Sequence, residues 1–556
     1  MGRLLRIVMI AAMLLVSTQS QADDLSPSLK TMLDQNTFPL TEGLGVVVLS
    51  QRPYLKQFYQ QRDYRPAWEN DHHTEELIAQ LLQSINKATK DGLDPSHSAY
   101  HKTRIQQLSD PITPENQVFR DILLSDAFMA LGSHLYHGVA FKTEVDTLHR
   151  VIQPNHLNRV ALLEKALQTR QITSSLSSLA PRHPRYQNLK KALHNYQKIA
   201  DQGGWNEDPE AYLDPEQVKK RLLITGEFHA PTDPKPTSVN GNSVSDSVNW
   251  HWSGSITDAE NNDPLTEAVK TFQRRQHITV DGIVGVQTRL KLAESVHQII
   301  ERIRLNLERW RWFNPLVEDN YVMVNIPDFS MQYINDEQRL SMNVVVGQKK
   351  RQTPMMQAKM SYLVFNPYWR IPKTILAEDI LPKLRKNREY LKANQITLFS
   401  SADQTESDPL NAEDIDWNRV TPNGMLRYIF RQEPGLKNPL GSLKFMFPNS
   451  EDIYIHDTSA RYHFKNKAFL VSSGCIRAEK PIQLAYELLV NDHPEVTYES
   501  LYQQIQSGQR QVIWLKEKIP VYLTYQTAWA DEEGILYLRN DVYGHDAKVL
   551  NFIKQI

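Results

Sequence analysis

The chain has 556 residues, of which 40% are hydrophobic and 23% are charged, a composition that is usual for a soluble globular protein. Its formal net charge of −1 gives no general attraction to a polyanion, which argues against nucleic acid as a partner. At about 150 residues per domain, the chain has room for about three domains with cores of their own.

Residues 1–22 have the pattern of a secretory signal peptide. Arg3 and Arg6 give a positive start, residues 7–16 are apolar, and Ser20-Gln21-Ala22 fits a cleavage site. The apolar run is short for a membrane span. We therefore expect a cleaved signal, with an uncleaved anchor as the alternative.

Residues 25–205 carry apolar side chains at helical spacing. One predicted helix has Thr74 as its N-cap and is followed by Gly92, which is placed to end it. A second predicted helix runs from Val118 to Leu135. We expect these apolar stripes to form the core of an N-terminal helical domain.

Residues 212–295 predict a small module of three short helices, split by an insertion at residues 229–263 that is rich in Pro, Ser, Thr, Asn and Asp. Asp281-Gly282 predicts a tight turn before the last helix. The predicted helices cover residues 214–223, 264–276 and 286–292.

Residues 296–315 predict one long helix that connects this module to the C-terminal part of the chain. Four arginines lie mainly between its apolar positions, and we expect them to form a solvated face. These residues are Arg302, Arg304, Arg309 and Arg311.

Residues 320–518 predict a domain rich in strands, followed by a closing hairpin within residues 519–556. The insertion at residues 373–423 is helical in its first half and polar afterwards, and it separates two predicted strands. We expect it to act as a lid that excludes water. The first predicted strands cover residues 321–326, 331–334 and 339–346.

Cys475 is the only cysteine in the sequence, and His456 lies 475 − 456 = 19 residues before it. In an exported protein a single cysteine has no intramolecular disulfide partner, which favours a reactive thiol over a structural one. The nucleophile is the thiolate, so we expect Cys475 to be ionised beside His456 as its base. The amides of Gly474 and Cys475 are the predicted donors to an oxyanion.

The pattern Ile455-His456-Asp457-Thr458, followed by Ser472-Ser473-Gly474-Cys475-Ile476-Arg477, resembles the active-site signature of the L,D-transpeptidases, whose YkuD-type domain cross-links bacterial peptidoglycan. The usual signature has Gly after the histidine and His or Asn before Gly-Cys. Asp457 and Ser473 resemble instead the large periplasmic branch of the family. Other segments are similar to the scaffold domain of that branch and to its peptidoglycan-binding module; these are residues 62–68, 91–95, 137–138 and 272–293.

The resemblance implies a multidomain α+β fold, with a helical scaffold, a three-helix peptidoglycan-binding module and a mostly-β catalytic domain with an inserted helical lid. The candidate substrate-binding residues are Arg477, Tyr454, Ser473, Trp369 and Asn366. Some of these have a second interpretation, because Arg477 also suits a structural ion pair, and Tyr454 and Trp369 also suit packing. We expect no metal and no cofactor.

The resulting hypothesis is a periplasmic L,D-transpeptidase that forms 3→3 cross-links between diaminopimelate residues through a cysteine thioester. Its donors and acceptors would be tetrapeptide stems, and carbapenems would inhibit it. The alternatives are an L,D-carboxypeptidase or lipoprotein-attaching variant, and a peptidoglycan-binding scaffold without activity. A papain-like or amidase-type hydrolase fits less well, because its cysteine normally precedes its histidine.

Overall fold

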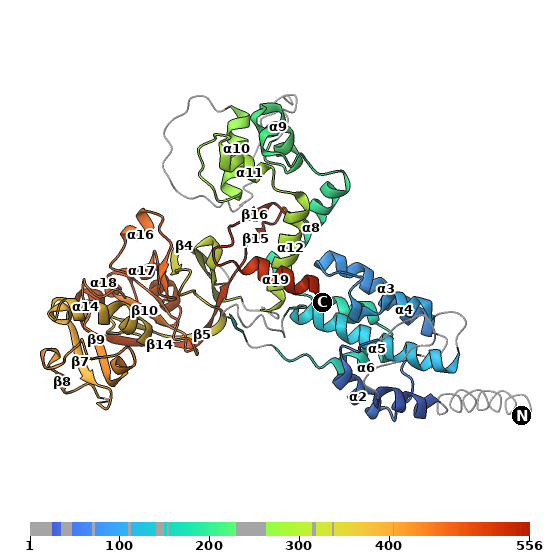
Figure 1. Ribbon diagram of the computed structural model, residues 1–556, viewed down its shortest axis with the longest axis horizontal. Coiled ribbons are helices and arrows are strands. Elements are labelled where there is room, and N and C mark those ends of the chain that lie inside the picture. The colour runs from blue at the N-terminus through green and yellow to red at the C-terminus, as the bar shows by residue number, and fades with distance from the viewer. Residues whose placement is uncertain are drawn as a thin grey trace, which may run out of the picture.

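A computed structural model describes most of the chain (Figure 1). The predicted signal peptide and nearly all of the predicted insertion at residues 229–263 lie outside the described residues. No helix in the described part of the chain is both long enough and apolar enough to cross a membrane. The described ranges are 25–34, 47–68, 73–108, 113–140, 150–152, 155–228, 263–313, 319–335, 338–403 and 405–555.

The N-terminal region is helical, as predicted. Helix α3 begins one residue earlier than expected, because His73 takes the cap position and the Thr74 hydroxyl donates to the Trp68 carbonyl (2.7 Å). Gly92, at φ 76°, follows a short 3-10 turn that extends α3. The helices are α2 (Arg52–Gln61), α3 (Thr74–Lys87), α4 (Lys102–Gln107), α5 (Pro114–His137), α6 (Arg159–Thr169), α7 (Ile172–Ser177) and α8 (Pro184–Asp201).

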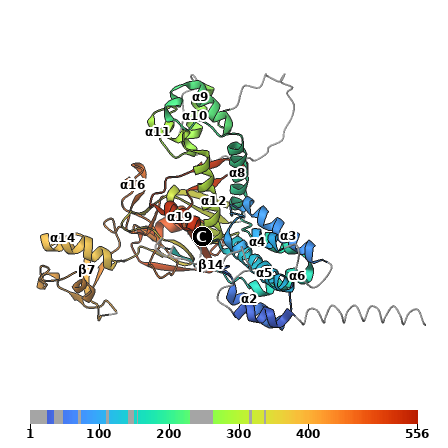
Figure 2. The same cartoon turned by 45° about the vertical axis from the view of Figure 1, so that its right-hand side comes forward.

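The predicted module folds around a separate small core that includes Leu222, Phe272 and Leu292. The side-chain amide of Gln273 accepts hydrogen bonds from the backbone N–H groups of Asp281 and Gly282 (3.0 and 2.9 Å), which holds the predicted turn. Figures 1 and 2 both show this module at the far end of α12, apart from the other helices. Its helices are α9 (Pro215–Ile224), α10 (Pro264–Arg275) and α11 (Val286–Leu292).

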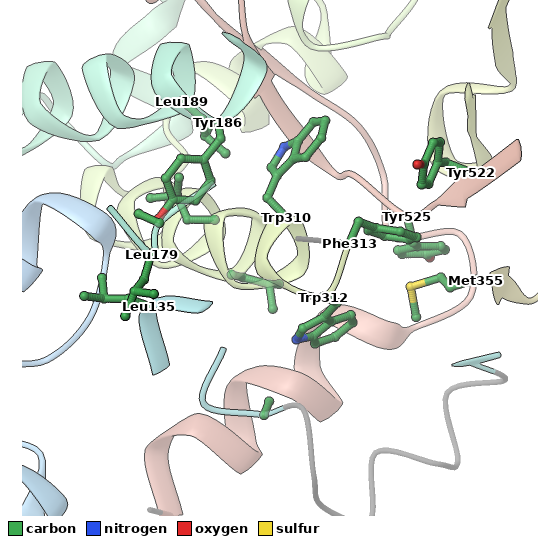
Figure 3. Close-up of a cluster of buried hydrophobic side chains, with 14 of the residues drawn as sticks. Leu135, Leu179, Tyr186, Leu189, Trp310, Trp312, Phe313, Met355, Tyr522 and Tyr525 are labelled. Atoms are coloured by element: carbon green, nitrogen blue, oxygen red, sulfur yellow. The ribbon is translucent and has the colours of Figure 1, made fainter. Parts of the chain in front are cut away.

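The connecting helix α12 (Val296–Arg311) is buried around its C-terminal half, so the expectation of a solvated arginine face is wrong there. Arg309 and Arg311 are 0% and 2% exposed because they pair with Asp546 and Glu308 (2.7 and 2.9 Å). The aromatic residues at this end of α12 lie between side chains of the helical region and of the sheet (Figure 3). Helix α12 therefore joins the N-terminal helices to the large sheet.

The predicted strands form the first part of a large mixed sheet. Its order is β1-β5-β10-β11-β13-β4-β3-β2-β14, and a further pairing of β5 with β14 closes the path on itself. The strands are β1 (Arg150–Val151), β2 (Tyr321–Asn325), β3 (Ser330–Asn335), β4 (Gln338–Gly347), β5 (Met355–Phe365), β10 (Leu443–Met446), β11 (Ile455–His456), β12 (Leu470–Ser472), β13 (Ile476–Ala478) and β14 (Gln511–Thr524).

Two helices that come after β13 share the apolar core of this sheet. They are α17 (Pro481–Leu489) and α18 (Tyr498–Gln506). Their buried Leu484, Leu488 and Leu501 belong to the same core as Phe445 and Ile455 of the sheet. A one-turn helix, α16 (Tyr462–Lys465), lies in the connection between β11 and β12.

The predicted closing hairpin is wrong in its first strand. Residues 519–524 belong to β14 and pair with β5 and β2, because a segment with every residue buried suits the middle of a sheet. The actual hairpin pairs β15 (Ala528–Ala530) with β16 (Leu536–Leu538). The chain then adds α19 (His545–Gln555), which was not predicted.

The insertion is a small α+β subdomain rather than a purely helical lid. Its helical first half is confirmed as α13 (Lys373–Ile375), a π-helical turn (Leu376–Ile380), α14 (Leu381–Lys386) and α15 (Tyr390–Ala393). The second half supplies β7 and β8, which join the flanking β6 and β9 in a sheet of order β6-β9-β7-β8 with its own apolar core. Its strands are β6 (Trp369–Arg370), β7 (Ile396–Ser400), β8 (Pro409–Leu410) and β9 (Tyr428–Gln432).

Candidate active site

One face of the large sheet carries the reactive and charged side chains. His456 of β11 lies opposite Arg477 of β13 and opposite Lys444 of β10. Residues opposite each other in a ladder share a face, as do residues two apart along a strand. Tyr454 and Cys475 therefore lie on this same face. The other face holds the fully buried Phe445, Ile455 and Ile476.

The Cys475 side chain is partly exposed on this face. Its Sγ lies 3.9 Å from the Asp452 carbonyl oxygen and is hydrogen-bonded by both the hydroxyl and the backbone N–H of Tyr454. Burial of the thiol raises its pKa, and the Tyr454 hydrogen bonds and the Lys444 and Arg477 charges only partly oppose this. Burial therefore favours a protonated resting thiol, whereas the sequence led us to expect an ionised one.

His456 is buried, with 4% of its surface exposed. The Asp457 carbonyl oxygen accepts a hydrogen bond from Nδ1 of its ring. Burial, reinforced by the charge of Arg477, lowers the pKa of His456 to about 3. At neutral pH the imidazole is uncharged and has the protonation state of a general base.

The structure brings Cys475 and His456 onto adjacent strands as diagonal neighbours. Among the described contacts of Sγ, the hydrogen-bonding side chain is that of Tyr454 rather than His456. Catalytic hydrogen bonds are often made only in the substrate complex, so this resting geometry is compatible with a cysteine and histidine pair.

The loop before Cys475 is fixed by hydrogen bonds of its own. Gly474 has φ 112°, which favours glycine, and its carbonyl accepts from the Thr353 hydroxyl (2.7 Å). Its N–H donates to Ser472 Oγ (3.2 Å). In this structure the Gly474 amide is thus occupied and does not serve as an oxyanion donor. The backbone N–H of Cys475 has no acceptor among the described residues, so it remains the candidate donor to the oxyanion.

Arg477 lies next to the site with no ion pair in the described part of the chain. Its guanidinium is largely buried, and its Nε has no hydrogen-bond partner. Burial lowers its pKa. This geometry offers no support for the structural ion pair considered from the sequence, and it leaves a cation available to a substrate carboxylate.

Lys444 is a second cation of this face, and it was missed in the sequence. Its Nζ lies 3.8 Å from the centroid of the Tyr454 ring. Burial lowers its pKa, while the nearby Cys475 acts to raise it. The sequence did contain a signal for Lys444. Phe445 and Phe447 alternate with Lys444 and Met446, so if the phenylalanines face the core, the lysine lies on the other face of the sheet.

The other predicted substrate-binding residues differ in their surroundings. Trp369, on β6, is partly buried and donates its indole N–H to the Tyr454 hydroxyl. Ser473 Oγ accepts from Arg351 Nη1 (2.9 Å), and the same guanidinium pairs with Asp379 of the insertion (2.7 Å). These contacts link the insertion to the loop that holds Cys475.

Asn366 is buried and has a structural role. Its side-chain amide donates to the carbonyl oxygens of Gln504 and Gln509 (3.0 and 3.1 Å). The structure thus gives no support for Asn366 as a substrate-binding residue.

Three segments of the chain match known families. Residues 319–497 match the family described as "L,D-transpeptidase catalytic domain", residues 53–193 match "Scaffold domain", and residues 251–292 match "Putative peptidoglycan binding domain". A relative from Haemophilus influenzae, named "Putative L,D-transpeptidase", is 30% identical over 294 residues. The similarity covers 52% of this chain and 57% of that relative, so the chain spans little more than half of the relative's length.

The fold is that of a multidomain protein with a helical N-terminal region and a mostly-β C-terminal domain. Its segments are similar to the catalytic domain of the L,D-transpeptidases, to a scaffold domain and to a peptidoglycan-binding domain, which agrees with the resemblance seen in the sequence.

Proposed function

We propose that this protein is an L,D-transpeptidase that forms 3→3 cross-links between peptidoglycan stems through a thioester on Cys475. The main support is the shared sheet face, where a partly exposed thiol has a hydroxyl donor, a neutral histidine and two cations around it. Nucleophile, base and charge stabilisation are the elements that acyl transfer needs.

In the first half-reaction, His456 would take the thiol proton as Sγ attacks the carbonyl of the third stem residue. The C–N bond to the terminal D-alanine breaks, and His456 returns the proton to the leaving amine. Because both partners rest uncharged, the proton moves during the attack. Tyr454, Lys444 and Arg477 would stabilise the sulfur as its negative charge develops.

In the second half-reaction, the side-chain amine of a diaminopimelate on a neighbouring stem would attack the thioester. His456 accepts a proton from that amine and delivers it to the departing sulfur, which restores the thiol. The new amide bond is the 3→3 cross-link. Arg477 would hold a stem carboxylate during these steps.

The insertion would act as the lid that favours an amine acceptor over water. Arg351 joins it to the catalytic loop, because one guanidinium contacts Ser473, Glu378 and Asp379. Such a bridge would close the site when substrate is bound.

Purified protein mixed with disaccharide-tetrapeptide, with products weighed by mass spectrometry, tests the proposal. A cross-linked dimer is expected from the native enzyme, and none from Cys475→Ala. Loss of D-alanine alone would favour the carboxypeptidase alternative. Transfer of the stem to a protein lysine would favour the lipoprotein-attaching alternative, and the absence of any product would favour the inactive scaffold.

A carbapenem supplies a second, covalent test. One drug-sized mass addition on Cys475 is expected, and it should be absent from Cys475→Ala. An equal addition to both proteins would overturn the assignment of the nucleophile.

We also propose a periplasmic location, on the basis of the signal-peptide pattern in residues 1–22. N-terminal sequencing of protein from the periplasmic fraction should begin at Asp23. A start at Met1 in the membrane fraction would favour the uncleaved anchor.

A further inference from the structure

A row of side chains at matching register positions crosses the catalytic face of the sheet, starting at Cys475. Ile455 pairs with Ile476 of β13 and with Phe445 of β10. One residue earlier on β11, Tyr454 therefore lies opposite Cys475 on one side and opposite Met446 of β10 on the other. Met446 pairs with Tyr362 of β5, and Tyr362 pairs with Trp514 of β14. The row thus crosses the neighbouring strands β13, β11, β10, β5 and β14 on one face.

The far end of the row is an exposed aromatic pair. Trp514 is 63% exposed, and its ring centroid lies 4.5 Å from that of Tyr362. Large aromatic side chains are normally buried for most of their surface. The register of β14 is interrupted directly after Trp514, before Ile519, so this pair lies at the last regular position of the strand.

The spacing of the row matches the donor substrate of the proposed reaction. With strands about 4.8 Å apart, Tyr362 lies roughly 14 Å and Trp514 roughly 19 Å from Cys475 along the sheet. Three extended residues, from the reacting carbonyl to the start of the stem, span roughly 11 Å. The group that joins the stem to its sugar extends this by several ångströms, which brings the sugar over the aromatic pair.

We propose that Tyr362 and Trp514 form a sugar-binding subsite that stacks on a pyranose ring of the donor's glycan. A pyranose presents C–H bonds along one face, and these suit the negative face of an aromatic ring. The buried Tyr454 and the partly buried Met446 form the floor between this subsite and the thiol. This inference rests on the proposed function, because it takes Cys475 as the point where the stem reacts.

The test compares two donors, a disaccharide-tetrapeptide and the same tetrapeptide without sugar, by steady-state kinetics. In Trp514→Ala the KM for the disaccharide donor should rise about tenfold while kcat is unchanged. The KM for the sugar-free peptide should not change. Trp514→Phe should restore most of the lost affinity.

Tyr502→Ala is the matched control, because Tyr502 is an exposed aromatic residue (47%) of α18, outside the row. It should change neither KM. Calorimetry of both donors on Cys475→Ala measures the same preference without turnover, and Trp514→Ala in that background should remove it.

The outcomes separate the two proposals. If the native enzyme converts neither donor, the proposed function fails. If it converts both, but Trp514→Ala has no effect or weakens both equally, the sugar subsite is wrong and the exposed pair serves another purpose, such as a protein contact. A loss confined to the disaccharide donor establishes the subsite.

Discussion

The C-terminal half of α12 and the catalytic face around Cys475 both hold buried charges, but their charges have different partners. On α12, Glu308 accepts from the Ala140 N–H (2.8 Å) and pairs with Arg311 (2.9 Å). On the catalytic face, Arg477 has no ion pair among the described residues, and Lys444 lies over an aromatic ring. A charge whose partner comes from the same chain holds the fold, whereas one without such a partner is available to a ligand.

Glu308→Ala should strongly destabilise the protein, because it leaves Arg311 unpaired in the core. We expect the free energy of unfolding in urea to fall by about 3–5 kcal/mol. Glu301→Ala, which removes an exposed ion pair with Lys554, should cost less than about 1 kcal/mol. Equal effects of the two substitutions would mean that burial of the pair does not matter.

Arg477→Met should lower activity and leave stability nearly unchanged, the opposite of what is expected for Glu308→Ala. It removes a cation that has no ion-pair partner among the described residues, so the unfolding free energy should stay within about 0.5 kcal/mol or rise. Transpeptidation should slow about 10- to 100-fold, the value of a hydrogen bond to a charged group. Arg419→Met, which removes a largely exposed arginine of the insertion, should leave the rate unchanged. A destabilised Arg477→Met protein with normal turnover would place Arg477 with the α12 charges.

Acid should destabilise the protein through its buried histidines. Burial lowers the pKa values of His134, His183 and His456 from 6.5 to about 3. Below pH 6.5 the unfolded chain therefore binds more protons than the folded protein. The stabilisation from these neutral rings is complete above pH 6.5 and is lost as the pH falls toward 3, by up to about 1.4 kcal/mol per pH unit for each histidine.

Thermal unfolding between pH 7 and 4 measures this effect. His134→Asn should give a shallower fall of Tm with pH than the native chain, whatever its Tm at pH 7. The same substitution at the exposed His156 should leave the slope unchanged. An unaltered slope in His134→Asn would show that this histidine is charged or unprotected in the folded protein.

Lys444→Met should make the Cys475 thiol slightly less reactive. The charge of Lys444 helps to lower a cysteine pKa that burial raises, so its loss should raise that pKa further. We expect alkylation of Cys475 by iodoacetamide to be about threefold slower at pH 8. Both proteins should react faster as the pH rises above 8. A plateau below pH 7 would instead indicate an ionised resting thiol.

The sequence predicted the strands and the reactive pair because each depends on neighbours along the chain. Strands β2 to β4 follow from runs of apolar residues. The lone Cys475 with Gly474 and His456 identified the site. The insertion was only half predicted, because its strands β7 and β9 pair with each other across a long connection, and such pairing leaves little local signal.

The roles of the charged residues could not be predicted in the same way. Arg309 has the same helical context as an exposed arginine, and only contact with Asp546, far away in the chain, makes it a core residue. The Gly474 amide looked available until the fold placed Ser472 Oγ against it.

The order of residues along the chain was enough to recognise the family resemblance and to predict a nucleophile and the helical and stranded regions, because these depend on local chemistry and periodicity. Which charges are paired, which histidines are neutral, and how Cys475 aligns with Trp514 were decided by the tertiary structure. Those properties depend on desolvation and on the register between distant strands, and both arise only when segments far apart in the sequence pack together.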